Sequence, residues 1–418
     1  MLTLIQALNY RCLNYIRRPL GPFHVLVGPN AGGKTTFLDS VAFLGDLVSD
    51  GLEAAVYKRT TNIQDLFWKR SGESFELAVE ASIPDELRPK LANPEFEEIR
   101  YEISVGYGDE SEISILWEKA LLKTAASEDE APAQRELFPF SFAPPQTIGT
   151  PSRAKGTKLV VNKSGAGNDN YYSETKKRWN PSFKLGPRKS ALGNLPEDET
   201  RFPVATWFKN LLAEGVQPFA LNSLLMRKAS PPGQRRKLNP DGSNLPWIVK
   251  RLRKQAPDND NFSAWISHLR TALPDIEDIK VETRDDDKHS YLNVCYRNGL
   301  EVPSWVVSDG TLRLLALTLP AYLPDITGVY LIEEPENGIH PHAVETVFQS
   351  LSSVYNAQVL LATHSPVILS VADPKQVLCF AKTPEGATDI VLGSEHPALK
   401  DWRGETDLGT LLSAGALN

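Results

Sequence analysis

The chain has 418 residues, of which 41% are hydrophobic and 23% charged, as is ordinary for a globular protein long enough for two or three domains. Its formal net charge of -7 argues against nucleic-acid binding over the whole surface, so any such binding has to be local. The three cysteines are far apart without CxxC spacing, so neither a zinc site nor a disulfide framework is indicated. No signal peptide is recognisable, and the longest apolar stretch, residues 312–323, is shorter than the roughly 20 residues that cross a bilayer. We therefore expect a cytoplasmic protein without a membrane partner.

The N-terminal segment alternates short apolar runs with polar breaks. The runs "TLIQAL" and "FHVLVG" are typical of strands, and residues 34–47 then have the apolar spacing of a helix. Alternating runs at residues 74–83 and 99–108 predict strands of an antiparallel sheet. The segment thus begins with a strand, a loop and a helix and continues with an antiparallel subdomain.

The middle of the chain changes character twice. From about residue 125 to residue 198 it is rich in Pro, Ser, Gly and Asn with weak periodicity, which predicts long loops with short strands. Residues 202–273 have helical patterning, and residues 291–307 return to strand character.

The C-terminal third is the most regular part. Residues 311–323 and 342–355 predict helices, whereas residues 328–334 and 357–365 predict apolar strands. Apolar strands that alternate with helices indicate a buried, largely parallel sheet. The sequence therefore predicts an α/β fold.

The stretch "GPNAGGKTT", residues 28–36, fits the pattern G-x-x-x-x-G-K-[ST] at every fixed position. Backbone N–H groups can wrap around a phosphate only where side chains stay out of the way, which explains the glycines. In this pattern Lys34 reaches the β and γ phosphates, and the Thr35 hydroxyl binds Mg²⁺. The alternative is a Gly-rich turn before a helix.

The apolar run "VYLI" ends in Glu333 and Glu334, and a Pro, Asn and Gly turn follows. A buried strand that ends in adjacent carboxylates is costly unless a cation or a proton donor lies there. A phosphate-bound Mg²⁺ is such a cation, as in the Walker B segment of P-loop enzymes. Glu333 would then hold Mg²⁺ through water, and Glu334 would polarise the attacking water. Taken alone, two Glu residues at a strand end are more often a solvated edge.

Two further segments are candidates for the site because of their order in the chain. Ser308 and Gly310 lie at the start of a predicted helix, which forms either a second anion site or an ordinary N-cap. His364 follows an apolar strand, where an imidazole could sense a γ-phosphate, although a lone His at a strand end is usually structural.

The order of these motifs resembles that of the ABC-type ATPases, and more closely that of their SMC, RecF and OLD-like branch. "NYRCL" at residues 9–13 is similar to the opening of that branch. "SDGTLR", "EEPENGIHP" and "ATHSP" are similar to the wording of stand-alone OLD-like ATPases, including the ATPase subunits of PARIS-type and Septu-type defence systems. The resemblance covers residues 1–85 and 300–418 and only loosely the middle. It implies a P-loop NTPase fold, an ABC-type head with a mixed sheet, an antiparallel β-subdomain and a helical and loop-rich insertion.

The resemblance also implies a mechanism that needs two heads. ATP is enclosed between the P-loop of one subunit and the signature segment of the other, which in this chain is residues 308–310. Ser308 and Gly310 would contact the γ-phosphate in trans, and Glu334 would be the general base. Lys34 and His364, the switch histidine, would complete the catalytic set, while Thr35 and Glu333 would hold Mg²⁺. The nucleotide-binding residues implied are Arg11, Gly28, Asn30, Gly32, Gly33, Lys34, Thr35, Thr36, Ser308, Gly310 and, in the dimer-facing turn, Asn337.

We expect three parts: ATPase lobe I at residues 1–120, an insertion at residues 121–300 and ATPase lobe II at residues 301–418. The sequence departs from the family pattern at the metal acid, which is Glu333 instead of Asp. Ala31 replaces a Gly of the P-loop, which is tolerable if this residue stays out of a left-handed conformation. The Q-loop glutamine is not placed, since Gln64 and Gln146 are both weak candidates.

Two basic groups are candidates for nucleic-acid contact, because Lys and Arg lie among aromatic side chains in the first group and a second basic group could join it. The alternatives are a solvated loop and an acidic protein partner. The candidate contact residues are Lys176, Lys177, Arg178 and Trp179 in one group and Arg235, Arg236 and Lys237 in the other.

The resemblance implies an ATPase that dimerises around ATP, as a homodimer or a higher oligomer, and regulates a separate effector in antiphage defence. The chain ends about 50 residues after "ATHSP", too few for the TOPRIM domain of OLD nucleases, so we expect a separate TOPRIM-like or HNH nuclease. Two alternatives stay open. One is a RecF-like DNA repair ATPase, and the other is an ATP-dependent scaffold that sequesters a toxic effector.

Overall fold

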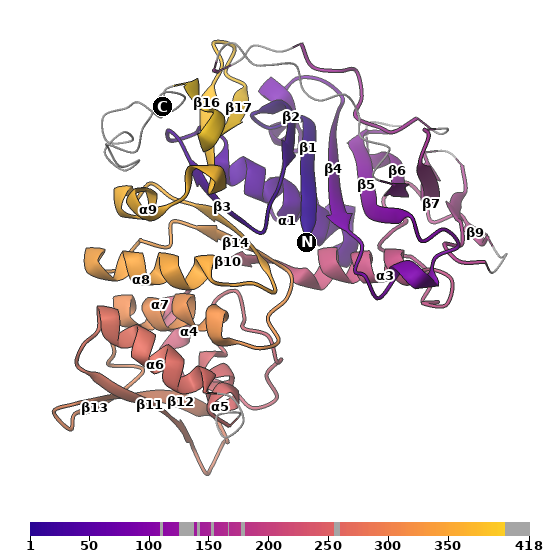
Figure 1. Cartoon of the computed structure of the whole chain (residues 1–418). Coiled ribbons are helices and arrows are strands. Elements are labelled where there is room, and N and C mark those ends of the chain that lie inside the picture. The colour runs from indigo at the N-terminus through magenta and orange to yellow at the C-terminus, as the bar shows by residue number, and fades with distance from the viewer. Residues whose placement is uncertain are drawn as a thin grey trace.

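Three sheets organise the protein in the computed structural model (Figure 1). The structure describes residues 1–108, 112–124, 138–139, 143–151, 154–165, 167–176, 180–254 and 260–397. The eight-stranded sheet is antiparallel and has the order β2-β1-β4-β5-β6-β7-β8-β9. Its strands are β1 (Leu2–Tyr10), β2 (Leu13–Pro19), β4 (Ser74–Ser82), β5 (Phe96–Tyr107), β6 (Ile113–Thr124), β7 (Thr157–Ser164), β8 (Asp169–Tyr171) and β9 (Ser182–Phe183).

The six-stranded sheet has the order β10-β14-β15-β3-β16-β17, and all its neighbouring pairs are parallel except β16 with β17. Its strands are β3 (Phe23–Val27), β10 (Val216–Phe219), β14 (Val329–Glu333), β15 (Gln358–Ala362), β16 (Val377–Lys382) and β17 (Thr388–Leu392). The three-stranded sheet is formed by β11 (Ile276–Thr283), β12 (Ser290–Tyr296) and β13 (Glu301–Pro303).

Some of the described helices pack on the six-stranded sheet, and others belong to a separate lobe. The described helices are α1 (Lys34–Asp50), α2 (Leu52–Tyr57), α3 (Pro203–Asn210), α4 (Ser223–Met226), α5 (Leu245–Lys254), α6 (Asn261–Ala272), α7 (Asp309–Thr318), α8 (Pro341–Ser352) and α9 (Pro366–Val371). Helices α4 to α6 and the three-stranded sheet form the lower lobe of Figure 1. None of the described helices is long and apolar enough to cross a membrane.

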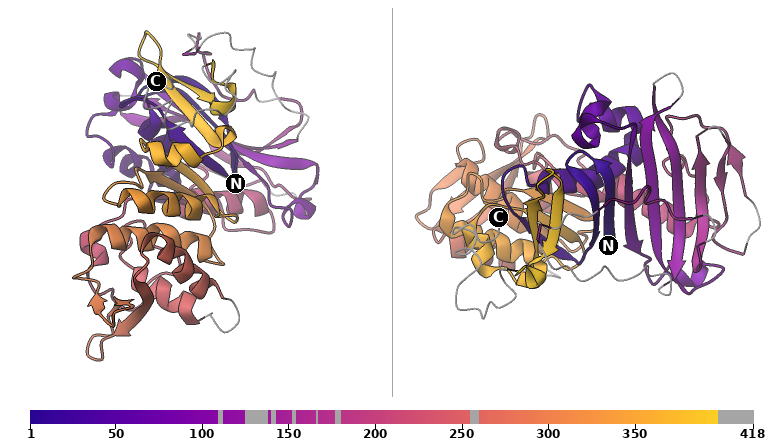
Figure 2. Two further views of the ribbon diagram at one scale, coloured as in Figure 1. Left: turned by 60° about the vertical axis from the view of Figure 1, so that its left-hand side comes forward. Right: turned by 90° about the horizontal axis from the view of Figure 1, so that it is seen from above.

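The six-stranded sheet separates two hydrophobic cores. On β3, Leu26 belongs to one core and Val25 and Val27 to the other, because alternate residues of a strand point to opposite faces. On β14, Leu331 and Tyr330 divide in the same way. The first core contains α1 and reaches the eight-stranded sheet, and the second lies on the side of α7, α8 and the lower lobe (Figures 1 and 2). Both faces are buried, which explains why these strands are nearly continuous apolar runs.

The fold class expected from the sequence is confirmed as a mixed α/β fold with a central, largely parallel sheet. The strands expected at residues 74–83 and 99–108 are β4 and β5, and the last two expected strands are β14 and β15. Strands β7 to β9 fall within the segment assigned to the insertion, yet they continue the eight-stranded sheet. The three domain boundaries stay a prediction.

Candidate nucleotide site

The P-loop connects β3 to α1 and is shaped by two closely packed glycines. Gly28 and Gly33 have φ values of +143° and +106°, which side chains rarely adopt. A Cβ on Gly28 would lie 2.3 Å from the backbone oxygen of Phe380, and one on Gly33 would lie 2.2 Å from the Thr388 hydroxyl. Glycine is therefore required here by both conformation and space.

Lys34 is the first residue of α1, and its side chain folds back over the P-loop. Its ammonium donates hydrogen bonds to the backbone oxygens of Gly28, at 2.8 Å, and Pro29, at 3.0 Å. Burial lowers the pKa of Lys34, whereas the carboxylates of Glu334 and Glu333 act to raise it. A cation held in this position can exchange its backbone contacts for the oxygens of a phosphate.

One cavity, of about 400 Å³, adjoins the P-loop, and we call it the nucleotide cavity. It brings together most of the residues that the sequence singles out, although they come from five separate segments. Gly28, Ser308, Gly310 and Asn337 do not line it. Its lining consists of Arg11, Cys12, Asn30, Ala31, Gly32, Gly33, Lys34, Thr35, Thr36, Glu333, Glu334, Ala362, His364, Lys382 and Gly386.

Backbone strain is concentrated at this cavity. Seven non-glycine residues of the described chain have positive φ, and three of them line it: Arg11 (+51°), Ala31 (+58°) and Glu334 (+46°). Such conformations persist where the surrounding structure enforces them, and they cluster at functional sites. Ala31 has a left-handed φ, so the condition under which an Ala replaces this Gly without strain is not met, and the P-loop carries a strain of about 1–2 kcal/mol there.

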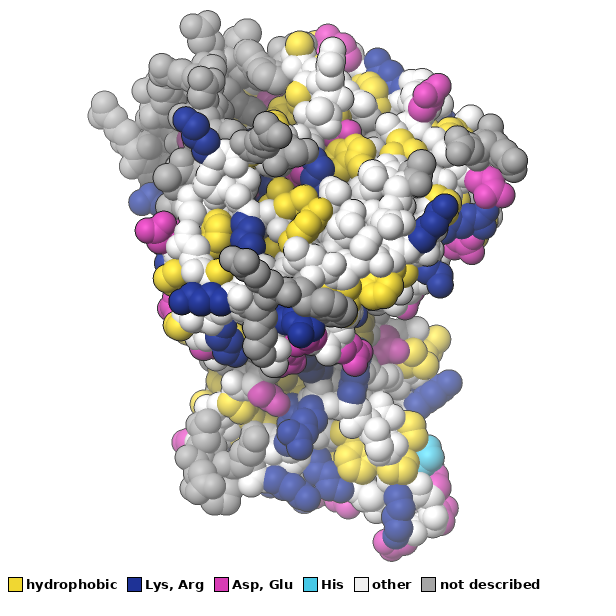
Figure 3. Space-filling model, turned by 90° about the vertical axis from the view of Figure 1, so that its right-hand side faces the viewer, with side chains coloured by type: hydrophobic (Ala, Val, Ile, Leu, Met, Phe, Trp, Pro, Cys, Tyr) yellow, Lys and Arg dark blue, Asp and Glu magenta, His cyan; other side chains and the backbone are white. Residues whose placement is uncertain are grey.

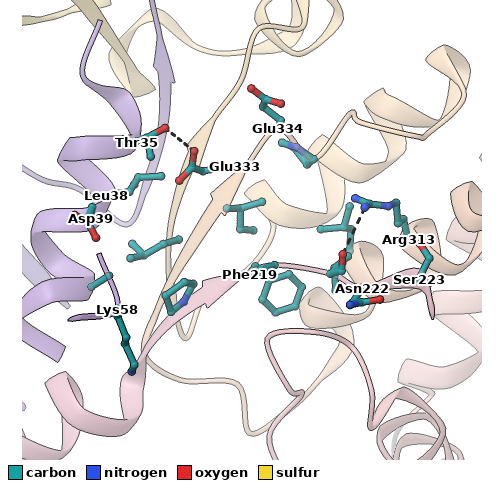
Figure 4. Close-up of a pocket in the computed structure, with 18 of the residues that line it drawn as sticks. Thr35, Leu38, Asp39, Lys58, Phe219, Asn222, Ser223, Arg313, Glu333 and Glu334 are labelled. Carbon is teal, nitrogen blue, oxygen red and sulfur yellow. Dashed lines mark hydrogen bonds between the residues drawn. The ribbon is translucent and has the colours of Figure 1, made fainter. Parts of the chain in front are cut away.

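A hydrogen bond joins the side chains of Thr35 and Glu333, which both line the nucleotide cavity. Thr35 Oγ1, on α1, donates a hydrogen bond of 2.6 Å to Glu333 Oε2 at the end of β14 (Figure 4). A hydroxyl and a carboxylate are hard oxygen ligands of the kind that Mg²⁺ prefers. The two residues therefore fit a Mg²⁺ ion that also binds nucleotide phosphates.

Glu334 lies just beyond the end of β14 and is exposed. Its backbone N–H donates to Ala362 O at 2.8 Å, which extends the pairing of β14 with β15. The side chain of Asn337 donates a hydrogen bond to Glu334 Oε2. The carboxylate is thus held outside the sheet, where it can accept a proton from a water molecule.

A larger cavity, of about 890 Å³, lies on the other side of Glu333, between α1 and α7, and we call it the interlobe cavity (Figure 4). Residues 218–224, the end of β10 and the segment after it, line this cavity, and Asn222 caps α4. Neither Gln64 nor Gln146 lines either cavity. The Q-loop glutamine therefore stays unassigned.

Arg11 lines both cavities and belongs to a half-buried charge network. Its guanidinium lies 3.1 Å from Asp39, which also accepts hydrogen bonds of 2.6 Å from Tyr10 and from Arg59. Arg59 in turn pairs with Asp46 at 2.8 Å. The network fixes the N-terminal hairpin against α1, and sequence spacing gave no sign of it.

The signature segment lies at the start of α7. Ser308 is the N-cap of this helix, because its hydroxyl accepts a hydrogen bond from the N–H of Thr311 at 3.2 Å. Gly310 packs against the turn after β14, where a Cβ would lie 2.7 Å from Gly338 O. Ser308 is exposed.

The structure describes only part of the first basic group but all of the second. Lys176 is exposed, whereas Lys177, Arg178 and Trp179 lie outside the described residues. The second group, residues 235–237, lies in the loop before α5, with Arg235 and Arg236 exposed and Lys237 half-buried.

The hairpin of β16 and β17 was not anticipated as part of the site. Thr388 Oγ1 donates to Gly32 O at 3.0 Å, and Thr388 N donates to Cys12 O at 2.9 Å. Lys382 and Gly386, in the same hairpin, line the nucleotide cavity. Two apolar runs separated by "TPEG" were a usable hairpin signal, but nothing in the sequence places the hairpin against the P-loop.

Comparison with known proteins assigns the family. The model of the family described as "AAA domain, putative AbiEii toxin, Type IV TA system" matches residues 23–370, which is 348 of 418 residues. The chain belongs to this AAA family. This family, a short match to an OLD nuclease and the fold of SMC heads support the resemblance to the OLD-like and SMC-like branch of the ABC-type ATPases.

The following similarities of this AAA-family chain to known proteins are short or limited to the fold. An OLD nuclease of Thermus scotoductus is 50% identical over 48 residues, which span 11% of this chain and 9% of the nuclease. An SMC head bound to the C-winged helix domain of ScpA aligns with a TM-score of 0.53 at 13% identity, over 93% of this chain and 96% of the head. An SMC head with an extended coiled coil, derived from Pyrococcus furiosus, aligns with a TM-score of 0.51 at 11% identity, over 93% and 95%. At these identities the structures show a shared fold.

The contact between Thr388 and the P-loop leads to a prediction. Thr388→Val removes the hydrogen bond to Gly32 O while keeping the side-chain shape, so the loop is less firmly held before nucleotide binds. A hydrogen bond contributes about 1 kcal/mol, so we expect ATP affinity to fall about fivefold in isothermal titration calorimetry.

Thr383→Val is the matched control, because Thr383 lies in the same hairpin and its hydroxyl accepts a hydrogen bond from Ala387 N at 3.2 Å. We expect this variant to bind ATP normally. Equal loss of affinity in both variants would mean that the hairpin as a whole, not its contact with Gly32, supports the loop.

Proposed function

We propose that this protein binds and hydrolyses Mg-ATP between two copies of its head and uses this cycle to regulate a separate effector. The observation that carries the proposal is the nucleotide cavity. It gathers the P-loop, Glu333, Glu334 and His364 from segments that are about 300 residues apart in the chain.

In this proposal the chain's own groups have distinct roles. Lys34 and the P-loop amides bind the phosphates, and Thr35 and Glu333 hold Mg²⁺, which supplies charge neutralisation when bound. Glu334 accepts the proton of the attacking water, and His364 senses the γ-phosphate.

A second copy is required because the signature does not reach the cavity of its own chain. Ser308 and Gly310 are not part of the cavity lining, and Ser308 is exposed. Trp305 and Val306 just before it are 47% and 65% exposed, an apolar surface that a partner can cover. The turn containing Asn337 contacts α7 through Gly310, so the elements proposed to face the partner lie together.

The direct test is phosphate release from ATP by the purified protein, measured with Mg²⁺ and with EDTA. We expect Mg²⁺-dependent hydrolysis that rises more than linearly with protein concentration, since two heads form the site. A protein that neither binds nor hydrolyses ATP would overturn the proposal.

The proposed setting is cytoplasmic antiphage defence, with a TOPRIM-like or HNH nuclease as the effector. Support comes from the short OLD nuclease match and from the family's description as a putative toxin of a type IV toxin–antitoxin system. An ATP-dependent scaffold that holds a toxic effector uses the same chemistry. Co-purification with a neighbouring gene product, sensitive to ATP, is expected in both cases.

A second candidate function is direct nucleic-acid binding, as in RecF-like ATPases. Residues 227–254 contain nine Lys or Arg and one Asp, a net charge of +8 in a chain with a net charge of -7. Figure 3 shows Lys and Arg side chains gathered on the lower lobe. Six of the nine cations make no ion pair within the described residues: Lys228, Arg235, Arg236, Lys237, Lys250 and Lys254. This basic surface fits a phosphate backbone.

Neutralising residues 235–237 to Gln tests this function. If the three side chains contact phosphates, affinity for a labelled DNA duplex falls, and the slope of log K against log salt becomes less steep by roughly 2–3. Fluorescence anisotropy over a salt series measures both quantities.

The control is a triple variant of Lys69, Lys90 and Lys155 to Gln, which removes the same charge from exposed positions outside the lower lobe. We expect it to leave the salt slope unchanged. If the two triple variants changed the salt slope equally, net charge alone would explain the effect. If the wild-type protein did not bind the DNA duplex, this candidate function would be excluded.

A further inference from the structure

The turn after β14 and the loop after β15 are joined at the edge of the nucleotide cavity. Glu333 pairs with Ala362 in the sheet, and the N–H of Glu334 donates to Ala362 O at 2.8 Å. Within the described residues, no further backbone hydrogen bond joins the turn to the loop. Any further contact between the turn and the loop has to come from side chains.

Glu336 makes that contact. Its Oε1 accepts hydrogen bonds from the Thr363 hydroxyl at 2.7 Å and from the backbone N–H of His364 at 2.9 Å. Thr363 is fully buried, and its hydroxyl also accepts from Ser365 N at 2.9 Å. One carboxylate oxygen thus connects the acidic turn to two consecutive residues of the loop, 27 and 28 positions later in the chain.

The other oxygen of this carboxylate, Oε2, is buried and has no hydrogen-bond partner in the structure. An unsatisfied buried carboxylate oxygen is unfavourable, and native proteins keep such groups rarely. Within the described residues the carboxylate is therefore held through Oε1 alone.

His364 depends on this contact for its position. The residue is exposed and lines the nucleotide cavity. Its imidazole makes no hydrogen bond or ion pair within the described part of the chain. The ring is therefore placed through its backbone, and the side-chain group that holds that backbone is Glu336.

We propose that Glu336 is a positioning residue for ATP hydrolysis, which fixes the backbone of His364 relative to Glu334. The proposal rests on the proposed function, because it assigns no chemistry to Glu336 itself. Glu334 and Glu336 belong to one turn, so a displacement of the Glu334 carboxylate is transmitted through Glu336 to the histidine. The acidic turn and the histidine loop then respond to the γ-phosphate as one unit.

The test is a double-mutant cycle with Glu336→Ala, His364→Ala and the double variant. Glu336→Ala should lower kcat roughly 10–100-fold, as misplacing a site residue does, with the Kd for ATP nearly unchanged. In the His364→Ala background, removing Glu336 should cost nothing further, because the group that it positions is already absent. Glu336→Gln retains Oε1 as an acceptor and should restore most of kcat.

Glu345→Ala is the matched control on the adjacent helix α8. Glu345 is exposed and accepts a hydrogen bond from Gln349 at 3.0 Å. We expect it to leave kcat unchanged. Thermal unfolding and the Kd for ATP are measured for every variant.

Three results would overturn the inference. The first is an equal loss of kcat on removing Glu336 with and without His364. The second is a fall in melting temperature and ATP affinity that parallels kcat and is not relieved in Glu336→Gln, which would mean a structural role only. The third is normal turnover by Glu336→Ala. Absence of hydrolysis by the wild-type protein would instead overturn the proposed function, and is recognised before any variant is compared.

Discussion

Lys34→Ala is expected to abolish ATP binding and hydrolysis. The ammonium lies over the P-loop and contacts the backbone oxygens of Gly28 and Pro29, so it already occupies the position from which it would meet the phosphates. Loss of a preorganised group that stabilises charge costs about 10²–10³-fold in rate, and here the ground-state phosphate contact is lost as well. Calorimetric ATP titration and phosphate release measure the two effects.

Lys58→Ala is the control for this substitution. Lys58 lies near α1 and lines the interlobe cavity, but it pairs with Asp46 and Asp50 at the surface. Surface ion pairs contribute about 0–1 kcal/mol, so the variant should keep its affinity for ATP. If Lys34→Ala bound ATP as well as Lys58→Ala does, the nucleotide would have to bind away from the P-loop.

Glu334→Gln is expected to keep ATP binding, to lose turnover and to accumulate as a closed dimer. The amide retains the size of the side chain but cannot take up the proton of the attacking water. ATP binding, which depends on Lys34 and the P-loop, is untouched. The solution mass with Mg-ATP, at low and moderate salt, should be twice the chain mass of 46.3 kDa, and without ATP it should be lower.

Glu345→Gln, on the exposed side of α8, is the matched control, because it makes the same change from carboxylate to amide. It should turn over ATP and show no ATP-dependent doubling at steady state. Normal hydrolysis by Glu334→Gln would remove Glu334 as the general base. A mass that is already doubled without ATP would mean a constitutive oligomer and would move the regulatory step elsewhere.

Much of the candidate phosphate site could be predicted because its residues are close together in the sequence. The glycines, Lys34 and Thr35 lie within nine residues, and their order alone constrains how a backbone can wrap around an anion. Glu333 and Glu334 were recognisable because an apolar run ends in two carboxylates. Ser308 was left open between an anion site and an N-cap; the hydrogen bond from Thr311 N shows the N-cap, and the anion site stays a prediction.

Other features of the site depend on contacts between distant segments. The Ala31 conformation could not be read from residue type, because its left-handed φ is imposed by the packing of the loop. The ion pairs of Asp39 with Arg11 and Arg59 join residues from the first hairpin, α1 and the segment after α2. No periodicity or spacing in the sequence predicts such ion pairs.

The sequence by itself determined the class of the protein, the phosphate loop and the acids at the end of a buried strand, since each is a property of a few consecutive residues. Only the tertiary structure decided that β16 and β17 support the P-loop and that Glu336 reaches His364. Both depend on strand order and register in the six-stranded sheet, which bring together residues separated by 28 to 356 positions. These contacts form only when the whole sheet packs, so no short stretch of the sequence predicts them.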